Sequence, residues 1–506
     1  MTAAFAYDAV SYPSTALPQA HPGHLHAVAR MFGCDPAPVD RCRVLELGCG
    51  DGTHLIASAV GLPDATFVGL DLSASAVDRG NRLIADLGLR NATLHAVDVT
   101  TWDPPEPFDY AIAHGLYSWV PPAVRDAILR VFAAALGPTG VGYVSYNIYP
   151  GCYVRRMLWE MMRFHTADTA DPVAKMSEAV EFAKFLAAGG QGAKTDSAVA
   201  LMAHELESVI GGRDPRVLYH DDLGTFNDPV YVREFVAHAG RFGLRFVGEA
   251  EPFTMETRAF KPEIAKVLDG LAETDVVRKE QYIDFLRLRR FRETLVSPDG
   301  QRPLAEPLPE RIAGLAVSGQ PTWDGDCDPT SNSAVTFRAG KATARTDLPI
   351  AKAALVILAG CSPRRVPFAD LLARAAAKLG RPATAEDHTR LAELLTAVWM
   401  TGMVALHGHV PTYTDTASAR PTACPLARRQ VRDGPLATTR LHTTMRFEDA
   451  PTRRMVELLD GTRTPAEVAT EMVSAFPPDQ RPDPAALRAG LDTHLARMAQ
   501  GGLLVG

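Results

Sequence analysis

Short apolar runs alternate with amphipathic stretches in the first third of the chain. Five apolar runs are expected to form buried strands, at residues 43–47, 66–70, 93–97, 110–113 and 141–146. Between them, helical spacing of apolar residues covers 52–60, 73–87 and 121–136. Strands and helices that alternate in this way form a parallel sheet with helices on both faces. The pattern therefore predicts an α/β domain over residues 1–165.

Beyond this region the pattern is mainly helical, with a strand-like island at 244–248 and a proline-rich stretch at 303–309. Helices are expected at 167–209, 230–242, 261–271, 279–293, 367–379, 385–400, 452–459, 465–476 and 484–500, and a hairpin near 334–337. A chain of 506 residues is too long for one hydrophobic core. We therefore expect two further domains, a helical one at 166–310 and a winged-helix-like one at 311–506.

Composition and charge exclude several classes of protein. The net charge of −7 argues against non-specific nucleic-acid binding, and the seven scattered cysteines, without a CxxC pair, argue against a zinc site or a disulfide framework. The apolar stretch at 353–361 is too short to span a bilayer, and no secretory signal pattern is visible. We therefore expect a cytoplasmic protein without a metal, a nucleic-acid partner or membrane insertion. The sequence predicts nothing about its oligomeric state.

A glycine-rich turn follows the first predicted strand and precedes the first predicted helix. Glu46, Gly48, Gly50 and Gly52 form an ExGxGxG pattern, and Thr53 stands where a dinucleotide-binding loop would need glycine. Glycine allows a left-handed backbone and the close approach of a ligand. The acid before the loop suits a ligand with an ammonium group, and the loop amides suit a carboxylate. S-adenosylmethionine carries both groups, and we expect it as the cofactor.

Three further markers stand at the ends of the next three strands. Asp71, followed by Leu72, ends the second strand and would accept both ribose hydroxyls. Asp98 ends the third, where its carboxylate would accept the adenine amino group while the backbone N–H of Val99 donates to a ring nitrogen. His114 follows the fourth strand, where the methyl group should emerge. Ligands bind at the carboxyl edge of open α/β sheets, so four markers in this order predict one site.

Several motifs resemble the rickettsial-type protein lysine methyltransferases. They include Tyr7-Asp8, Tyr12-Pro13-Ser14, His21-Pro22 and the segments 115–121 and 143–151. Segments 220–223 and 281–287 resemble a methyltransferase regulatory domain, and segments 425–428 and 458–463 resemble the family's C-terminal winged-helix domain. The resemblance covers most of the chain in patches. Its most specific motifs lie before residue 152, and Asp51 departs from the family's usual glycine.

The resemblance implies a class I methyltransferase with a Rossmann-like domain, a mainly helical regulatory domain and a winged-helix-like C-terminal domain. It implies N-methylation of lysine in a protein or peptide substrate. It assigns cofactor roles to the marker residues named above, and Tyr12 would close the site over the methionine moiety.

Aromatic residues after the fourth and fifth strands are candidates for the substrate channel. Tyr117, Trp119 and Tyr146 would wall it and hold an alkylammonium by cation–π contact, or would instead pack a domain interface. Methyl transfer needs alignment more than a dedicated base, since water can take the lysine proton. Four arginines are expected on one long helix, as a solvated face or as a site for acidic substrate: Arg287, Arg289, Arg290 and Arg292.

Other functions compete with protein methylation. The same chemistry would serve a tailoring enzyme for peptide natural products or a small-molecule N- or O-methyltransferase. A chain without catalysis would be a binding protein that senses S-adenosylmethionine, its winged helix reading DNA or a leader peptide. Most of the chain follows residue 151, which favours a large substrate. We therefore expect residues beyond about 310 to bind substrate and not cofactor.

Overall fold

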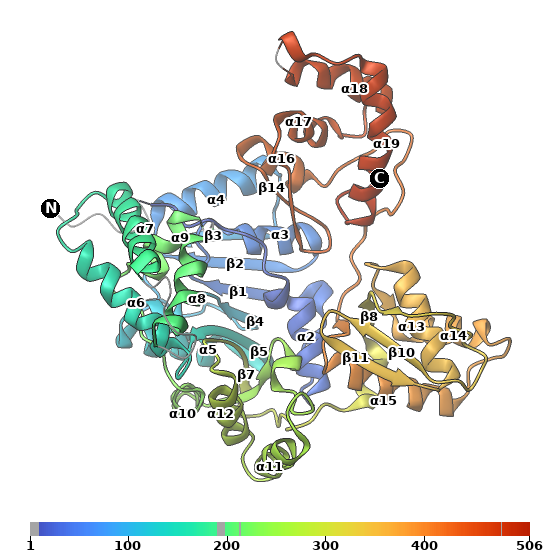
Figure 1. The fold of residues 1–506 in the computed structure, drawn as a ribbon, viewed down its shortest axis with the longest axis horizontal. Helices are drawn as coiled ribbons and strands as arrows, with labels where there is room; N and C mark the ends of the chain where they lie inside the picture. Colours follow the sequence, from blue (N-terminus) through green and yellow to red (C-terminus); the bar gives the residue numbers. More distant parts are fainter. Residues whose placement is uncertain (1–9, 190–197, 212–213, 477) are drawn as a thin grey trace.

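The protein is described by a computed structural model that covers residues 10–189, 198–211, 214–476 and 478–506. The motif residues Tyr7 and Asp8 lie outside the described residues. Figure 1 shows an α/β body with two further lobes at one side of it. The second lobe runs from β8 (Ala316–Gly319) to β13 (Val404–His407), and the third from α16 (Pro425–Asp433) to α19 (Pro484–Gln500).

The body is built around a seven-stranded sheet of order β3-β2-β1-β4-β5-β7-β6. The strands are β1 (Arg43–Leu47), β2 (Thr66–Asp71), β3 (Ala92–Ala96), β4 (Phe108–Ala113), β5 (Leu136–Asn147), β6 (Leu244–Glu249) and β7 (Phe291–Pro298). The first five strands pair in parallel, and β7 runs antiparallel to both β5 and β6. The predicted α/β fold is confirmed.

Two strands of this sheet come from the segment predicted to be helical. The island at 244–248 is β6, an edge strand of the main sheet. The helix expected at 279–293 is shorter, because α12 (Val276–Arg287) ends before Leu288, whose φ is 46°, and β7 begins at Phe291. The methyltransferase sheet therefore extends past residue 165. The predicted boundaries between independently folding units stay predictions.

Helices cover both faces of the sheet, because apolar side chains alternate along its strands. Val44 and Tyr143 belong to a core shared with α2 (Pro22–Met31), α3 (Thr53–Gly61) and α4 (Ala74–Asp86). On the opposite face, the core includes residues of α5 (Pro122–Ala135) and α10 (Val232–Arg241). Glu46 is two residues after Val44 on the same strand, so its side chain lies on the face of the sheet that α3 covers, beside the glycine loop.

A separate helical layer follows β5, with a small apolar core of its own. It consists of α6 (Cys152–His165), α7 (Pro172–Gly189), α8 (Ala198–Ile210) and α9 (Pro215–Asp221). The chain then passes through α10 and α11 (Pro262–Ala272) to α12. Because α6 begins where β5 ends, this layer stands over the carboxyl edge of the sheet (Figure 1).

The segment predicted as one C-terminal domain contains two lobes. The second lobe has β9 (Thr322–Trp323), β10 (Val335–Ala339), β11 (Ala342–Thr346), α13 (Pro349–Cys361), β12 (Val366–Pro367), α14 (Phe368–Lys378) and α15 (Ala385–Trp399). The third has β14 (Leu436–Thr438), β15 (Thr444–Arg446), α17 (Ala450–Leu458) and α18 (Pro465–Met472) between α16 and α19. Strands β10 and β11 form the expected hairpin. Over the described ranges, no helix is both long and apolar enough to span a membrane.

The third lobe docks on the body near α3 and α4. Arg429 forms an ion pair with Asp86 at 2.9 Å, and the Arg440 side chain donates to the carbonyl oxygen of Val60 at 2.5 Å. His442 Nε2 lies 2.9 Å from Nδ1 of His54, a residue of α3. These contacts hold the β14–β15 hairpin close to the carboxyl edge of the sheet.

Candidate active site

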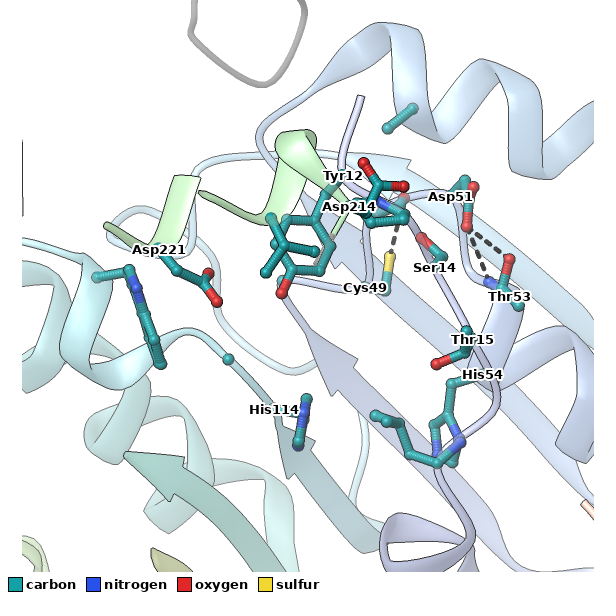
Figure 2. A pocket seen from close by; sticks show the side chains of 18 of the residues that line it. Tyr12, Ser14, Thr15, Cys49, Asp51, Thr53, His54, His114, Asp214 and Asp221 are labelled. Carbon is teal, nitrogen blue, oxygen red and sulfur yellow. Dashed lines mark hydrogen bonds between the residues drawn. The ribbon is translucent and has the colours of Figure 1, made fainter. Parts of the chain in front are cut away.

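A pocket of about 770 Å³ opens at the carboxyl edge of β1, β2 and β4. Figure 2 shows Tyr12 standing between the glycine loop and Asp221 of α9. Its lining includes Tyr12, Ser14, Glu46, Gly48, Gly50, Asp51, Asp71, His54, His114, Trp119, Asn147, Arg155, Trp159, Asp214, Asp221, Asn227, Arg290, Phe291, Leu436 and Arg446. The N-terminal segment, the sheet, the helical layer and the third lobe all contribute to one cavity.

The glycine loop adopts the left-handed backbone that its glycines allow. Gly48, Gly50 and Gly52 have φ of 69°, 56° and 72°. Gly52 does not line the pocket, and a β-carbon there would lie 2.7 Å from a methyl group of Leu94. Asp51 accepts hydrogen bonds from the backbone and hydroxyl of Thr53 at 3.1 and 2.8 Å (Figure 2). The acid that departs from the family pattern thus accepts hydrogen bonds from the first residue of α3.

Glu46 is a buried acid without a full set of partners. Its side chain is 5% exposed, and its Oε2 has no hydrogen-bond partner. Burial, with Asp51 and Asp71 nearby, raises the pKa of this carboxyl to about 8. Burying an unsatisfied carboxyl is costly, and a cation in the pocket would relieve that cost. The carboxyl of Glu46 is therefore suited to the ammonium group of the predicted cofactor.

The two acids predicted for ribose and adenine have different surroundings. Asp71 lines the pocket and accepts the backbone N–H groups of Gly50 and Ser73, each at 2.8 Å. Asp98 is exposed outside the pocket lining, and Thr100 donates to it and holds its pKa below the usual range.

Leu72 and Val99 also lie outside the pocket lining, so their cofactor contacts, like that of Asp98, stay predictions.

His114 lies at the end of β4 and lines the pocket. Its Nδ1 is 2.9 Å from the hydroxyl oxygen of Tyr143, and the next residue, Gly115, donates its N–H to Ser145 Oγ at 2.7 Å. Burial lowers the pKa of His114 to about 4, so its ring is neutral at pH 7. Sequence reasoning missed Tyr143, which connects this histidine to the interior of the sheet.

Of the three aromatic candidates, only Trp119 lines the pocket. Its indole Nε1 is buried without a hydrogen-bond partner. The Tyr117 hydroxyl contacts His238 at 2.7 Å, and the Tyr146 hydroxyl contacts Thr294 at 2.8 Å. Both tyrosines are buried in the core behind the sheet and do not line the pocket.

The alternation of side chains along β5 explains why Tyr146 lies behind the sheet and away from the pocket. Tyr143 belongs to the core on one face of the sheet and Tyr146 to the core on the other. Asn147, on the same face as Tyr143, lines the pocket and donates to Asn227 at 2.9 Å. Alternation along the strand places residues 143 and 146 on opposite faces. The sequence alone does not show which of the two faces the pocket side.

Polar side chains of the helical layer that line the pocket are hydrogen-bonded or ion-paired within the protein. Arg155 and Trp159 line the pocket, and both donate to the fully buried carboxylate of Asp222, the arginine at 2.8 Å. His220 contacts the carbonyl oxygen of Val10 at 2.7 Å, and its ring lies 5.7 Å from that of Tyr12. The helical layer thus anchors the N-terminal segment at the pocket, which Tyr12 lines; its closure over the methionine moiety stays a prediction.

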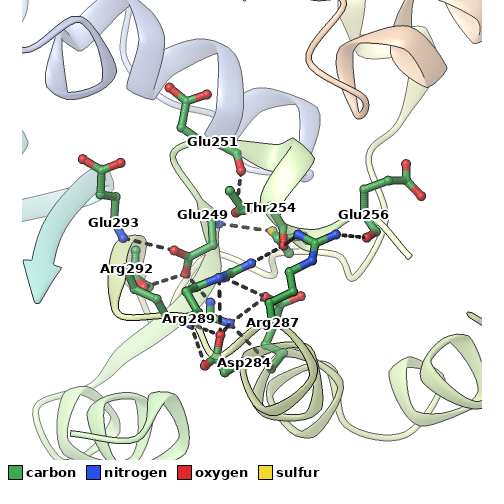
Figure 3. A network of polar contacts seen from close by, with 12 residues as sticks. Glu249, Glu251, Thr254, Glu256, Asp284, Arg287, Arg289, Arg292 and Glu293 are labelled. Atoms are coloured by element: carbon green, nitrogen blue, oxygen red, sulfur yellow. Dashed lines mark hydrogen bonds and ion pairs between the residues drawn. The ribbon is translucent and has the colours of Figure 1, made fainter. Parts of the chain in front are cut away.

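The four arginines do not lie on one helix. Arg292, on β7, is fully buried and forms ion pairs with Glu249, Glu280 and Asp284 at 2.6, 2.9 and 2.8 Å (Figure 3). Arg287 and Arg289 donate to the carbonyl oxygen of Thr254, whereas Arg290 pairs with Glu205 and lines the pocket. The prediction of one basic helix was wrong, because α12 ends at Arg287 and Arg292 lies on β7, buried by three acids.

The third lobe reaches the pocket through its hairpin. Leu436 of β14 and Arg446 of β15 line the same cavity as Gly50 and Asp71. Residues beyond about 310 therefore share one cavity with residues of the cofactor loop, and the expectation that they bind substrate and not cofactor stays a prediction. Among the described residues, no group of three or more histidine, cysteine or acidic side chains is placed to hold a metal.

Three family models match the chain, two in the body and one in the third lobe. A methyltransferase domain matches residues 44–140, a predicted methyltransferase regulatory domain matches 214–297, and a PKMT C-terminal winged-helix domain matches 419–480. The predicted methyltransferase is confirmed by these matches, and S-adenosylmethionine is the cofactor that this domain indicates.

The chain is similar to several proteins of Rickettsia. One uncharacterized protein of Rickettsia prowazekii is 34% identical over 291 residues, 57% of this chain and about half (52%) of that relative. Another from the same organism is 31% identical over 234 residues, 46% of this chain and 93% of the relative. The structure of PKMT2 from Rickettsia typhi matches with a TM-score of 0.85 at 24% identity, over 98% of this chain and 100% of that one, which shows a shared fold. The chain belongs to the family of methyltransferases that combine a class I methyltransferase domain, a methyltransferase regulatory domain and a PKMT-type winged helix.

Proposed function

We propose that this methyltransferase transfers the methyl group of S-adenosylmethionine to lysine side chains of a protein or peptide. The observation that carries the proposal is the pocket with two unlike ends. One end has the glycine loop, Glu46 and Asp71, and the other has Trp119 and Asp221 beneath the helical layer. The sequence motifs shared with the lysine methyltransferases and the PKMT-type winged helix support a lysine substrate. A structure of the Rickettsia typhi relative contains AdoHcy, which supports the cofactor end.

The cofactor end offers partners for each polar part of the ligand. Glu46 would hold the ammonium group, and the amides of the loop around Gly50 would meet the carboxylate. Asp71 uses one acceptor position on each oxygen for the backbone, which leaves capacity for the ribose hydroxyls. Asp98, Leu72 and Val99 would contact the adenine at the exposed edge. When bound, the cofactor supplies an electrophilic methyl group on a sulfonium sulfur.

The substrate end suits a cationic side chain. Asp221 lines it with a carboxylate, and Tyr12 and Trp119 line it with aromatic rings, whereas the carboxylate of Asp214 is paired with Arg216. Carboxylates attract an ammonium ion, and aromatic faces hold it by cation–π contact. An ordinary lysine amine has a pKa near 10.4, so freeing its lone pair costs about 4–5 kcal/mol at pH 7. Walls that exclude water lower that pKa and reduce the cost.

The second and third lobes offer a large surface next to the pocket, which favours a macromolecular substrate. Binding energy from contacts far from the reacting lysine would position its amine for attack. The unpaired state of all seven cysteines supports the cytoplasmic location that we propose.

Mass spectrometry tests this function. The full-length protein is incubated with methyl-deuterated S-adenosylmethionine and either a bacterial extract or poly-L-lysine. We expect deuterated methyl groups on lysine Nζ. Label found only on carboxylates, hydroxyls or small molecules would reject the lysine substrate. A folded protein that shows no heat of binding with S-adenosylhomocysteine in calorimetry would reject the cofactor assignment.

A further inference from the structure

A chain of three hydrogen-bonding side chains leads from the pocket across the sheet. His114 Nδ1 lies 2.9 Å from the Tyr143 hydroxyl oxygen, and that hydroxyl donates to Glu293 Oε1 at 2.8 Å. The Gln19 amide donates to the same carboxylate oxygen at 2.9 Å. The three residues stand at the end of β4, on β5 and on β7, which are neighbours in the sheet.

The direction of these bonds determines the tautomer of the histidine. A phenol has one proton, and Tyr143 gives it to Glu293. The Tyr143 oxygen therefore accepts a hydrogen bond from His114, which must carry its proton on Nδ1. The other ring nitrogen, Nε2, then has a free lone pair on a residue that lines the pocket.

We propose that His114, Tyr143 and Glu293 form the path by which the substrate amine loses its proton. This inference rests on the proposed function. The N–H bond of the lysine ammonium breaks as the proton bonds to His114 Nε2. The Nδ1 proton moves to the Tyr143 oxygen, and the former Tyr143 proton moves to the Glu293 carboxylate. Ammonium and carboxylate thus become free amine and carboxylic acid, with His114 neutral in its other tautomer.

The surroundings of the three groups favour transfer over storage at the histidine. Burial lowers the pKa of His114 to about 4, with His54 the nearby titratable group, so an imidazolium is disfavoured. Burial raises the pKa of Glu293 above its usual range, and the neighbouring Glu249 and Glu251 raise it further. Glu293 is therefore a better proton acceptor than an exposed glutamate.

Glu293 also has an exit to solvent. Its side chain is partly exposed, whereas the hydroxyl of Tyr143 is fully buried. Its backbone N–H donates to Glu249 at 3.1 Å, as Figure 3 shows, and His24 of α2 is near enough to interact electrostatically with its carboxylate. A proton that arrives on this carboxylate can pass to water, which restores the carboxylate. His114 must also return to its Nδ1-protonated tautomer, by proton exchange with water, before the next turnover.

Kinetics of a Tyr143→Phe variant of the full-length protein test the proposal, with poly-L-lysine as the probe. The variant keeps the ring and removes the hydroxyl that links the two ends. We expect kcat to fall about 10–100-fold at pH 7, within the usual range for assisted proton transfer. The deficit should shrink at pH 10, where a far larger fraction of the amine arrives without its proton than at pH 7. Glu293→Gln should show the same deficit and recovery, because its amide cannot take the proton.

The matched control is Tyr110→Phe. Tyr110 is a buried tyrosine of β4 whose hydroxyl donates to the carbonyl oxygen of Ala37 at 2.6 Å, outside the pocket. Its kcat should stay within about twofold of wild type. Circular dichroism checks that each variant is folded at both pH values, and calorimetry should show unchanged affinity of Tyr143→Phe for S-adenosylhomocysteine.

A second measurement does not depend on turnover. NMR of protein labelled with ¹⁵N-histidine should show His114 protonated on Nδ1 in the wild type, with that preference lost in Tyr143→Phe. A wild-type ring protonated on Nε2 would overturn the path. So would a kcat deficit equal at pH 7 and pH 10, or one matched by the control. If the wild type methylates no lysine at all, the proposed function fails and the path fails with it; a pH-independent deficit alone removes only the path.

Discussion

The two ends of the pocket are built in different ways. The cofactor end comes from one short stretch of chain, with Glu46, the glycine loop and Asp71 in adjacent strands and turns. The substrate end gathers Asn147, Trp159 and Asp221 from three elements, and Arg446 reaches the same cavity from the third lobe. A local site leaves a pattern in the sequence because caps and left-handed turns restrict residue types, whereas an assembled site leaves none.

The two ends of the pocket also differ in whether their charged side chains have partners within the protein. At the substrate end, Arg155 is paired with Asp222 and Arg290 with Glu205. At the cofactor end, Glu46 is buried with an oxygen that has no partner. Because burial raises its pKa to about 8, the ligand-free protein should lose stability as the pH rises through that value. The cofactor end is thus the part of the pocket that a cationic ligand completes.

The largest effect is expected for Asp71→Ala, which removes the acceptor for two backbone N–H groups of the cofactor end. Affinity for S-adenosylhomocysteine should fall by about 1.5–3 kcal/mol, roughly 10–150-fold, by calorimetry. Asp109→Ala is the control, since Asp109 accepts the Arg43 backbone N–H at 2.8 Å away from the pocket lining. Wild-type affinity in Asp71→Ala would mean that this acid only caps a helix.

A moderate effect is expected at the other end for Trp119→Phe. The change keeps an aromatic face and removes the unpartnered indole donor. We expect kcat/KM for poly-L-lysine to fall about 3–10-fold, the worth of one hydrogen bond, with unchanged affinity for S-adenosylhomocysteine. A loss of cofactor affinity would assign the indole to the cofactor end and weaken the comparison.

A smaller effect is expected for Asp98→Ala. This carboxylate is exposed, and water competes for any group that it contacts. Calorimetry should show a loss of cofactor affinity of about 0.5–1 kcal/mol, clearly less than for Asp71→Ala. A loss as large as that of Asp71→Ala would show that the exposed edge contributes as much as the buried one.

The smallest effect on turnover is expected for Tyr146→Phe, because its hydroxyl bonds to Thr294 behind the sheet. Turnover should stay within about twofold, while urea unfolding should show a loss of about 0.5–1.5 kcal/mol in stability. A large loss of turnover at unchanged stability would restore the sequence prediction that this tyrosine walls the channel.

Much of the body could be predicted because its signals are local. The apolar runs in the sequence predicted the positions of β1 to β5. The glycine pattern predicted the positive φ of Gly48, Gly50 and Gly52. The role of Tyr143 could not be predicted, since a shift of one residue in register exchanges the faces of a strand. An unanchored strand therefore left Tyr143 and Tyr146 indistinguishable.

The remaining errors have a common physical origin in contacts between distant segments. The charge of Arg292 suggested a solvated helix, but three acids bury it on a strand. The hairpin that carries Arg446 meets the pocket only because the third lobe docks on α3 and α4. Such contacts depend on tertiary packing, which periodicity does not encode.

Proton release on cofactor binding tests most directly the claim that the cofactor end awaits a cation. With a pKa of about 8, Glu46 is protonated in the free protein at pH 6 and must ionise to pair with an ammonium group. Calorimetry with S-adenosylhomocysteine, in two buffers of unlike ionisation heat, should detect about one proton released at pH 6 and almost none above pH 9. Affinity should rise with pH by up to about tenfold per unit below pH 8, and Glu46→Gln should abolish both effects. A wild-type protein that binds with pH-independent affinity and releases no proton would contradict the account.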